Sequence, residues 1–149
     1  MLMRNTALIL LLSLPGLVLA EGCPLNGYWK SNEAMTLASF GKAKNVTLKQ
    51  KELFSNRFFG KLYIYTECDK FITVMDDWIE TSQYKLVSAE GNSVKISYIE
   101  YPDDSSPTMK EAVFEGECYS VPVNGGQFRE YFCPVTEQEY NKAQKNDIH

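Results

Sequence analysis

Arg129 and Tyr131 are the pair of side chains in this chain best suited to bind an anionic ligand. They stand two residues apart in a segment typical of a strand, so their side chains point to the same face of a sheet. If that face is the interior, the guanidinium and the phenol can hold a carboxylate through charge-assisted hydrogen bonds. Two other arrangements are open. Arg129 stacks on Trp29 as a cation–π pair, or both side chains face solvent and leave Phe128 and Phe132 in the core.

Residues for acid–base or nucleophilic catalysis are scarce. His149 is the single histidine and the final residue, which argues against a Ser-His-Asp triad, a Cys-His pair and a multi-histidine zinc site. The cysteines show no Cys-x-x-Cys spacing, and there is no glycine-rich phosphate loop. We therefore expect a protein that is not an enzyme and that uses no cofactor or metal.

Two groups of acidic residues are the remaining candidates for chemistry. Paired carboxylates can serve a glycosidase or bind Ca²⁺. Neither group has the spacing of a Ca²⁺ loop, and both fall at predicted turns, where acids are well solvated, so we expect ordinary turns. The groups are Glu67 with Asp69, and Asp76 and Asp77 with Glu80.

Residues 1–20 are typical of an export signal. Arg4 supplies the positive start, residues 7–14 are almost wholly apolar, and Val18-Leu19-Ala20 is a small-residue cleavage site. All four cysteines follow this segment. We therefore expect a periplasmic or extracellular product whose cysteines form disulfides.

Residues 21–149 are enough for one domain with a core of its own. They contain 14 Lys and Arg against 19 Asp and Glu, a net charge of −5, with the lysines scattered among acids. Nucleic acid requires a focused positive face, so we expect no nucleic-acid partner, and an anionic membrane surface is disfavoured for the same reason. No later segment approaches the ~20 apolar residues of a membrane span.

Alternating segments rich in β-branched and aromatic residues predict eight strands joined mostly by short turns. This order favours a mainly β, antiparallel up-and-down barrel, because closure removes exposed edges. Capping boxes at Thr47 and Thr136 predict a short helix after the first strand, reaching about Asn56, and a C-terminal helix. The strands are expected at residues 27–31, 60–66, 71–75, 79–87, 94–99, 110–114, 117–123 and 127–133.

Two short motifs lie at the ends of this strand series. Gly27-Tyr28-Trp29 opens the first strand with a Gly-x-Trp, and Arg129-Glu130-Tyr131 places an Arg-x-Tyr in the last. With both motifs the chain resembles the lipocalins and, more broadly, the calycin superfamily. The resemblance implies that Trp29 closes the barrel base and that an arginine near the last strand packs across it. In related fatty-acid-binding proteins an Arg-x-Tyr binds the ligand carboxylate, which implies a ligand site of Arg129, Tyr131 and Trp29.

Four cysteines allow three disulfide pairings. If barrel closure places the start of the first strand beside the end of the last, Cys23 pairs with Cys133, and Cys68 is left with Cys118. We favour this pairing. The alternative pairing follows from a turn centred on Gly125-Gly126. Counting outward from this turn places Cys118 opposite Cys133, within disulfide range.

We expect an exported, non-enzymatic protein that holds a small apolar or amphipathic, fatty-acid-like ligand in its barrel. Arg129→Ala is then expected to weaken fatty-acid binding by more than about tenfold. The alternative is a filled barrel that meets a protein partner through its outer surface, as an inhibitor, immunity or envelope interaction protein. A cavity of roughly a few hundred Å³ favours the first function, and a packed interior favours the second. Seven tyrosines on or beside strands are expected to pack the sheet rather than line a cavity: Tyr63, Tyr65, Tyr84, Tyr98, Tyr101, Tyr119 and Tyr131.

Overall fold

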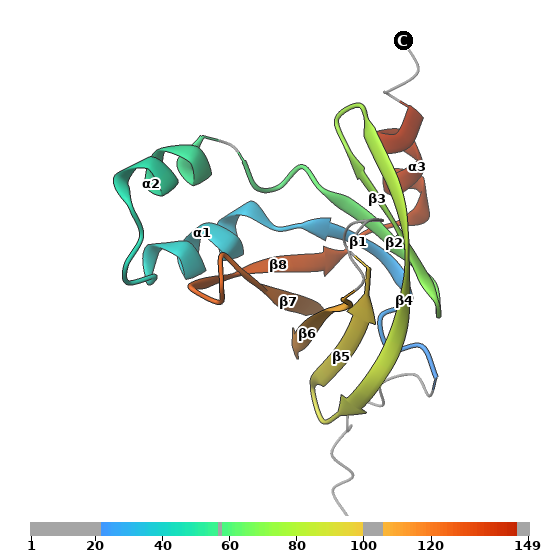
Figure 1. Ribbon diagram of the computed structural model, residues 1–149. Coiled ribbons are helices and arrows are strands. Elements are labelled where there is room, and N and C mark those ends of the chain that lie inside the picture. The colour runs from blue at the N-terminus through green and yellow to red at the C-terminus, as the bar shows by residue number, and fades with distance from the viewer. Residues whose placement is uncertain (1–21, 57, 100–105, 146–149) are drawn as a thin grey trace, which may run out of the picture.

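Eight strands follow one another around a closed antiparallel barrel in the computed structural model, which describes residues 22–56, 58–99 and 106–145 (Figure 1). Each strand pairs with its neighbours in sequence, and β8 pairs with β1, which confirms the predicted mainly β, up-and-down barrel. The strands are β1 (Gly27–Ser31), β2 (Tyr63–Thr66), β3 (Lys70–Met75), β4 (Trp78–Glu90), β5 (Ser93–Tyr98), β6 (Thr108–Glu115), β7 (Cys118–Val123) and β8 (Phe128–Pro134).

Strand β4 is longer than the sequence pattern indicates. It runs for 13 residues, and its register against β5 shifts between Leu86 and Ser88. A bulge inserts one unpaired residue, so the alternation of side chains reverses there. Because periodicity breaks at that point, the predicted strand ends at Val87 while the real one continues to Glu90.

The seam between β1 and β8 closes the barrel through three residue pairs. Trp29 lies opposite Pro134, Lys30 opposite Cys133 and Ser31 opposite Phe132. The expected closure of the barrel between its first and last strands is thus confirmed. After Ser31 the chain leaves the sheet at Asn32, whose side chain caps a helix by accepting a hydrogen bond from the Met35 N–H.

Helix α1 (Glu33–Gly41) takes the place of β1 along the rest of β8. The Tyr131 N–H donates to the Thr36 hydroxyl and the Arg129 N–H to the Ser39 hydroxyl, both at 3.0 Å. The Asn32 N–H donates to the Tyr131 carbonyl at 2.7 Å. These bonds satisfy a stretch of β8 backbone that would otherwise be an open sheet edge. The sequence predicted one helix between β1 and β2, and α1 is a second.

The predicted helix at Thr47 is α2 (Leu48–Ser55), and both hydrogen bonds of its capping box are present. Beside the barrel, α1 and α2 form a lobe (Figure 1). Aromatic rings join the lobe to β8, with neighbouring centroids 5.1 to 5.8 Å apart. The rings belong to Phe40, Phe54, Phe58, Phe59 and Phe128.

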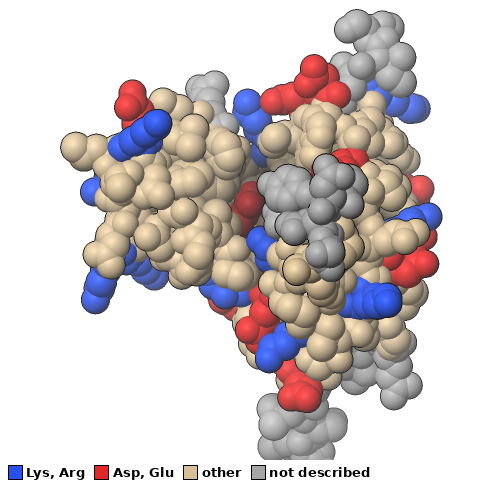
Figure 2. All heavy atoms as spheres, viewed as in Figure 1, with Lys and Arg blue, Asp and Glu red and all other residues tan. Residues whose placement is uncertain are grey.

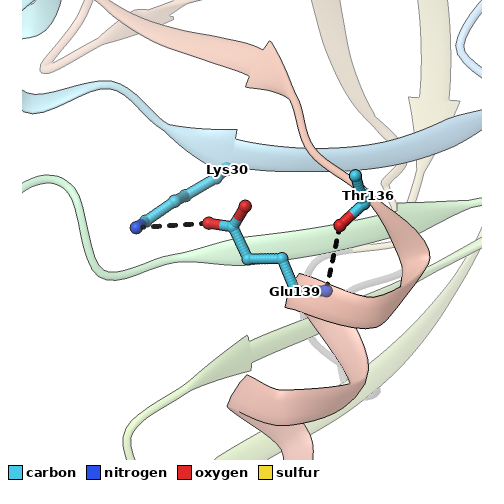
Figure 3. A network of polar contacts seen from close by, with 3 residues as sticks. All are labelled: Lys30, Thr136 and Glu139. Carbon is cyan, nitrogen blue, oxygen red and sulfur yellow. Dashed lines mark hydrogen bonds and ion pairs between the residues drawn. The ribbon is translucent and has the colours of Figure 1, made fainter.

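Helix α3 (Glu137–Lys145) lies against the outer face of β1 and β2. Tyr140 is buried there against the rings of both Tyr28 and Tyr65, at centroid distances of 5.3 and 6.0 Å. The Thr136 hydroxyl accepts a hydrogen bond from the Glu139 N–H, and the Glu139 carboxylate lies 3.7 Å from Lys30 Nζ (Figure 3). The expected C-terminal helix is therefore present and docked on the barrel.

The disulfides join Cys23 to Cys68 and Cys118 to Cys133. The favoured pairing of Cys23 with Cys133, and of Cys68 with Cys118, is wrong. Cys133 lies opposite Lys30, well past the start of β1, whereas Gly27 at that start lies opposite Thr66. The outward count through the β7–β8 turn gives the correct partner.

Two disulfides are consistent with an oxidising compartment. Among the described residues, no helix has the length and apolar character needed to cross a bilayer. The expected export signal at residues 1–20 lies outside the described residues, as do Tyr101 and His149.

Removal of the Thr36 hydroxyl tests the helix-capped seam. Thr36 is fully buried, and Thr36→Val keeps its shape while leaving the Tyr131 N–H without an acceptor. We expect the free energy of unfolding, measured by urea denaturation, to fall by about 1–3 kcal/mol. Thr36→Ser keeps the hydroxyl and serves as the control. A loss for Thr36→Val no larger than that for Thr36→Ser would contradict the assignment.

Candidate functional site

The barrel interior contains a cavity of about 200 Å³. Its walls come from every strand except β1 and are mainly apolar. The apolar wall residues include Leu62, Ile64, Phe71, Ile96, Val121 and Phe132. A cavity of this size and character is suited to a compact, largely apolar molecule.

Trp29 lies in the buried core of the barrel. Its indole N–H donates to the Leu25 carbonyl at 2.9 Å, and its ring meets Tyr119 edge-on at a centroid distance of 4.8 Å. Leu25 and Tyr119 in turn line the cavity. Trp29 therefore contacts two residues of the cavity wall but does not itself line the cavity.

Three of the predicted tyrosines line the cavity: Tyr84, Tyr98 and Tyr119. The Tyr84 hydroxyl donates to the Glu67 carbonyl, and burial is the main cause that raises the Tyr84 pKa. Burial also raises the pKa of Tyr119 far above its usual range, so this phenol stays protonated. The expectation of sheet packing holds for Tyr65 and its neighbour Tyr28, which stack on the outer face.

Glu130 brings a carboxyl group into this apolar interior. The strand register sets it beside Val121, on the same face as Phe132, and all three line the cavity. The Ser31 hydroxyl donates to the Glu130 carboxylate at 2.6 Å and accepts a hydrogen bond from the Gly60 N–H at 3.1 Å. Burial raises the pKa of Glu130, while the Ser31 hydrogen bond and the charge of Lys110 act in the opposite direction.

Lys110 is the other charged residue of the cavity wall. Ion pairs among the described residues join Lys30 to Glu139, Lys61 to Asp76 and Lys70 to Glu67, and neither Lys110 nor Glu130 belongs to one. The cavity therefore offers a carboxylate and an ammonium group that do not neutralise each other through direct contact. A ligand with a hydrogen-bond donor can meet the first, and one with an acceptor the second.

Arg129 and Tyr131 lie on the outer face of β8, away from the cavity. The Arg129 guanidinium donates to the hydroxyl and the carbonyl of Ser120 at 2.7 and 2.8 Å, and to the Glu111 carbonyl at 3.2 Å. The Tyr131 hydroxyl contacts the Glu115 carboxylate at 3.3 Å. Neither side chain lines the cavity, and Arg129 does not stack on Trp29. The outward arrangement, with Phe128 and Phe132 buried, is the one the structure adopts.

Glu130 is the site residue that sequence reasoning missed, although the signal was present. In the segment FREYF, Phe128, Glu130 and Phe132 share one face of the strand. Once the two phenylalanines are assigned to the interior, Glu130 must lie there too. The Arg-x-Tyr motif instead favoured Arg129 and Tyr131 as ligand-site residues, and these lie on the opposite face of the strand.

The acidic turns hold no site in the part of the chain that the structure describes. Glu67 lies 3.1 Å from Lys70, which lowers the Glu67 pKa, and Asp76 lies 3.7 Å from Lys61. No group of three or more His, Cys, Asp or Glu side chains within the described ranges is placed to hold a metal ion.

No family model, curated protein or solved structure matches this chain. The barrel is established by its own strand pairing, which closes from β1 through β8.

Arg129→Ala is expected to affect stability and not ligand binding. It removes three hydrogen bonds, two of them to Ser120, which is fully buried. The free energy of unfolding in urea should fall by about 1–3 kcal/mol. Lys95→Ala, at an exposed cation on β5, should change it by less than about 0.5 kcal/mol. Equal stability of the two variants would show that the Arg129 contacts contribute nothing.

Glu130→Gln should stabilise the protein in a pH-dependent way. Because burial raises the folded-state pKa of Glu130, the folded state is favoured when this group is protonated, and that advantage is lost as the pH rises through the folded-state pKa. Glutamine can still accept the Ser31 hydrogen bond. We expect the variant to be more stable than wild type at about pH 8, with a smaller difference at about pH 4. Thermal denaturation across this range measures the effect, and a pH-independent difference would contradict it.

Proposed function

We propose that this protein is a lipocalin-like, non-enzymatic carrier, exported from the cytoplasm, that holds a compact amphipathic molecule in its barrel. The observation that carries the proposal is the apolar cavity of about 200 Å³ with the Glu130 carboxyl group in its wall. A barrel filled only for stability would gain by an apolar residue at this position, since burying a carboxylate costs free energy. A ligand that supplies a hydrogen-bond donor compensates for that cost.

The cavity volume limits the size of the ligand. An apolar cavity of about 150 Å³ accepts benzene, so the cavity here accommodates about one ring with one or two small substituents. A long-chain fatty acid exceeds this volume. The proposal therefore narrows the expected fatty-acid-like ligand to a smaller molecule.

The wall chemistry specifies the polar end of the ligand. Glu130 accepts hydrogen bonds in its ionised form, so a primary amine or a hydroxyl group is the fitting partner. The rings of Phe71, Tyr84 and Tyr98 supply the apolar wall for the rest of the molecule. Close to Glu130 a ligand carboxylate would be repelled, so this position favours an amine or a hydroxyl over the carboxylate that the Arg-x-Tyr motif implied. An acceptor on the ligand would have to face Lys110 instead.

A panel of small aromatic probes tests the carrier proposal. We expect benzylamine and benzyl alcohol to bind at least about tenfold more tightly than benzoate in calorimetric titrations. Ala112→Leu should abolish binding, because Ala112 is buried in the cavity wall and leucine would fill the space. Native mass spectrometry of protein purified from its own source should show a bound small molecule. An apo mass together with no probe binding would rule out the carrier.

The alternative function, a protein that acts through its outer surface, gains support from a different observation. Several large apolar side chains are exposed in two places, on α2 and at the β3–β4 hairpin. Exposed apolar groups in a cluster are typical of interaction surfaces. The two functions are compatible, because the cavity and these surfaces are made of different residues.

A further inference from the structure

Charge is distributed unevenly along this chain. Residues 34–66 contain six Lys and Arg and a single acid, Glu52, whereas the rest of the chain after residue 20 contains eight cations and eighteen acids. Four of the six cations lie in α2 or between the end of α1 and the start of α2, and all four are exposed: Lys42, Lys44, Lys49 and Lys51. In Figure 2 the lobe on the left is mostly tan with blue at its margins and little red, while red side chains gather on the barrel. The molecule therefore has a basic lobe on an acidic barrel.

Exposed apolar side chains accompany these lysines. Leu48 is 85% exposed, Leu53 55% and Phe58 46%. The opposite side of α2 is partly covered, because the half-buried Phe54 packs against Phe40, Phe59 and Phe128. The outer side of the helix thus presents leucines and lysines that no described part of the chain covers.

The net charge of residues 21–149 disfavours an anionic membrane surface, but the basic lobe departs from that average. We infer that this surface docks on an anionic lipid bilayer. We call it the α2 surface and define it by Leu48, Lys49, Lys51, Leu53 and Phe58. Exposed leucine and phenylalanine side chains next to lysines can enter the headgroup region of a bilayer, where the apolar groups are buried and the cations meet lipid phosphates. The inference does not depend on the cavity or on its ligand.

The rest of the fold supports this orientation. The aromatic rings already fix α2 to β8, so docking requires no folding of the helix. The acid-rich barrel is repelled by an anionic surface, which leaves the basic lobe as the part that approaches it. Binding should therefore weaken as salt screens both the attraction and the repulsion.

A second copy of the chain fits the α2 surface less well than an anionic bilayer does. A symmetric pair would place Lys49 and Lys51 of one molecule against the same lysines of the other, and like charges oppose such contacts. An acidic protein surface, on another copy or on a different protein, is the remaining alternative partner.

The β3–β4 hairpin provides a matched control. Trp78 and Ile79 are exposed to 45% and 48%, similar to Leu53 and Phe58, but Asp76, Asp77 and Glu80 flank them. An anionic bilayer should repel this tip despite its apolar side chains. Replacing Trp78 and Ile79 removes exposed apolar groups without touching the α2 surface.

Vesicle flotation tests the inference with protein that is expressed with its export signal and purified after export, its N-terminus determined by mass spectrometry. We expect binding to vesicles of about three parts phosphatidylcholine to one part phosphatidylglycerol, and at least about tenfold weaker binding to phosphatidylcholine alone. Raising the salt from about 0.1 M to about 1 M should release the protein. The K49E/K51E double variant should bind at least about tenfold more weakly, and E52Q about fivefold more tightly.

The apolar contribution has its own variants. L48S/L53S should lose binding to the mixed vesicles, while W78S/I79S should bind like wild type. Near-ultraviolet circular dichroism and retained binding of benzylamine, where wild type binds it, show that each variant is folded.

Several results would overturn the inference. These are no binding to the mixed vesicles at low salt, equal binding by K49E/K51E and wild type, or an equal loss in W78S/I79S and L48S/L53S. Self-association in analytical ultracentrifugation that K49E/K51E abolishes, without vesicle binding, would assign the α2 surface to an acidic protein face instead.

Discussion

Closure of the barrel depends on how the backbone of β8 is satisfied on its β1 side. Only three residue pairs of β1 and β8 face each other, from Trp29 with Pro134 to Ser31 with Phe132. Beyond them, hydroxyl groups of α1 accept the N–H groups of Arg129 and Tyr131. An unpaired buried N–H costs free energy similar to a lost hydrogen bond, and an open edge invites pairing with other chains. One strand and one helix therefore share the task that a longer first strand would otherwise perform.

The same seam positions the candidate site and the lobe. Ser31, the last residue of β1, donates to Glu130 and so holds the carboxyl group at the cavity wall. Phe128, at the start of β8, faces the aromatic rings of α1 and α2 and fixes the lobe beside the barrel. The side chains that alternate with them, Arg129 and Tyr131, point outward and connect β8 to β7 and β6. Because successive side chains of β8 point to opposite faces, this one strand contacts the cavity, the lobe and the outer surface of the barrel.

Much of the fold was predictable because its signals are local. The eight strands follow from period-two alternation, and α2 follows from the reciprocal capping box of Thr47 and Gln50. The disulfide pairing could be narrowed to two alternatives, one of them correct by the count through the β7–β8 turn. The choice between them depends on where β1 stops pairing with β8, which is a tertiary property. In the FREYF segment, the Arg-x-Tyr motif was used to choose the site residues, although Phe128 and Phe132 indicate which face is buried. Glu130, on the same face as the phenylalanines, was missed as a result. Helix α1 has Met35 at the position where a capping box has Glu or Gln, so only half of that signal is present.

Helix α1 also carries a conflict between its own stability and that of the barrel. Thr36 and Ser39 are weaker helix formers than alanine, by up to about 0.7 kcal/mol each. An engineered α1 with alanine at both positions would be the better helix as an isolated peptide. In the protein it would leave two backbone N–H groups of β8 without acceptors and open the tube along one side. Substitutions that raise helix propensity should therefore destabilise the protein at these two positions, because the hydroxyl groups of Thr36 and Ser39 accept hydrogen bonds from the β8 backbone.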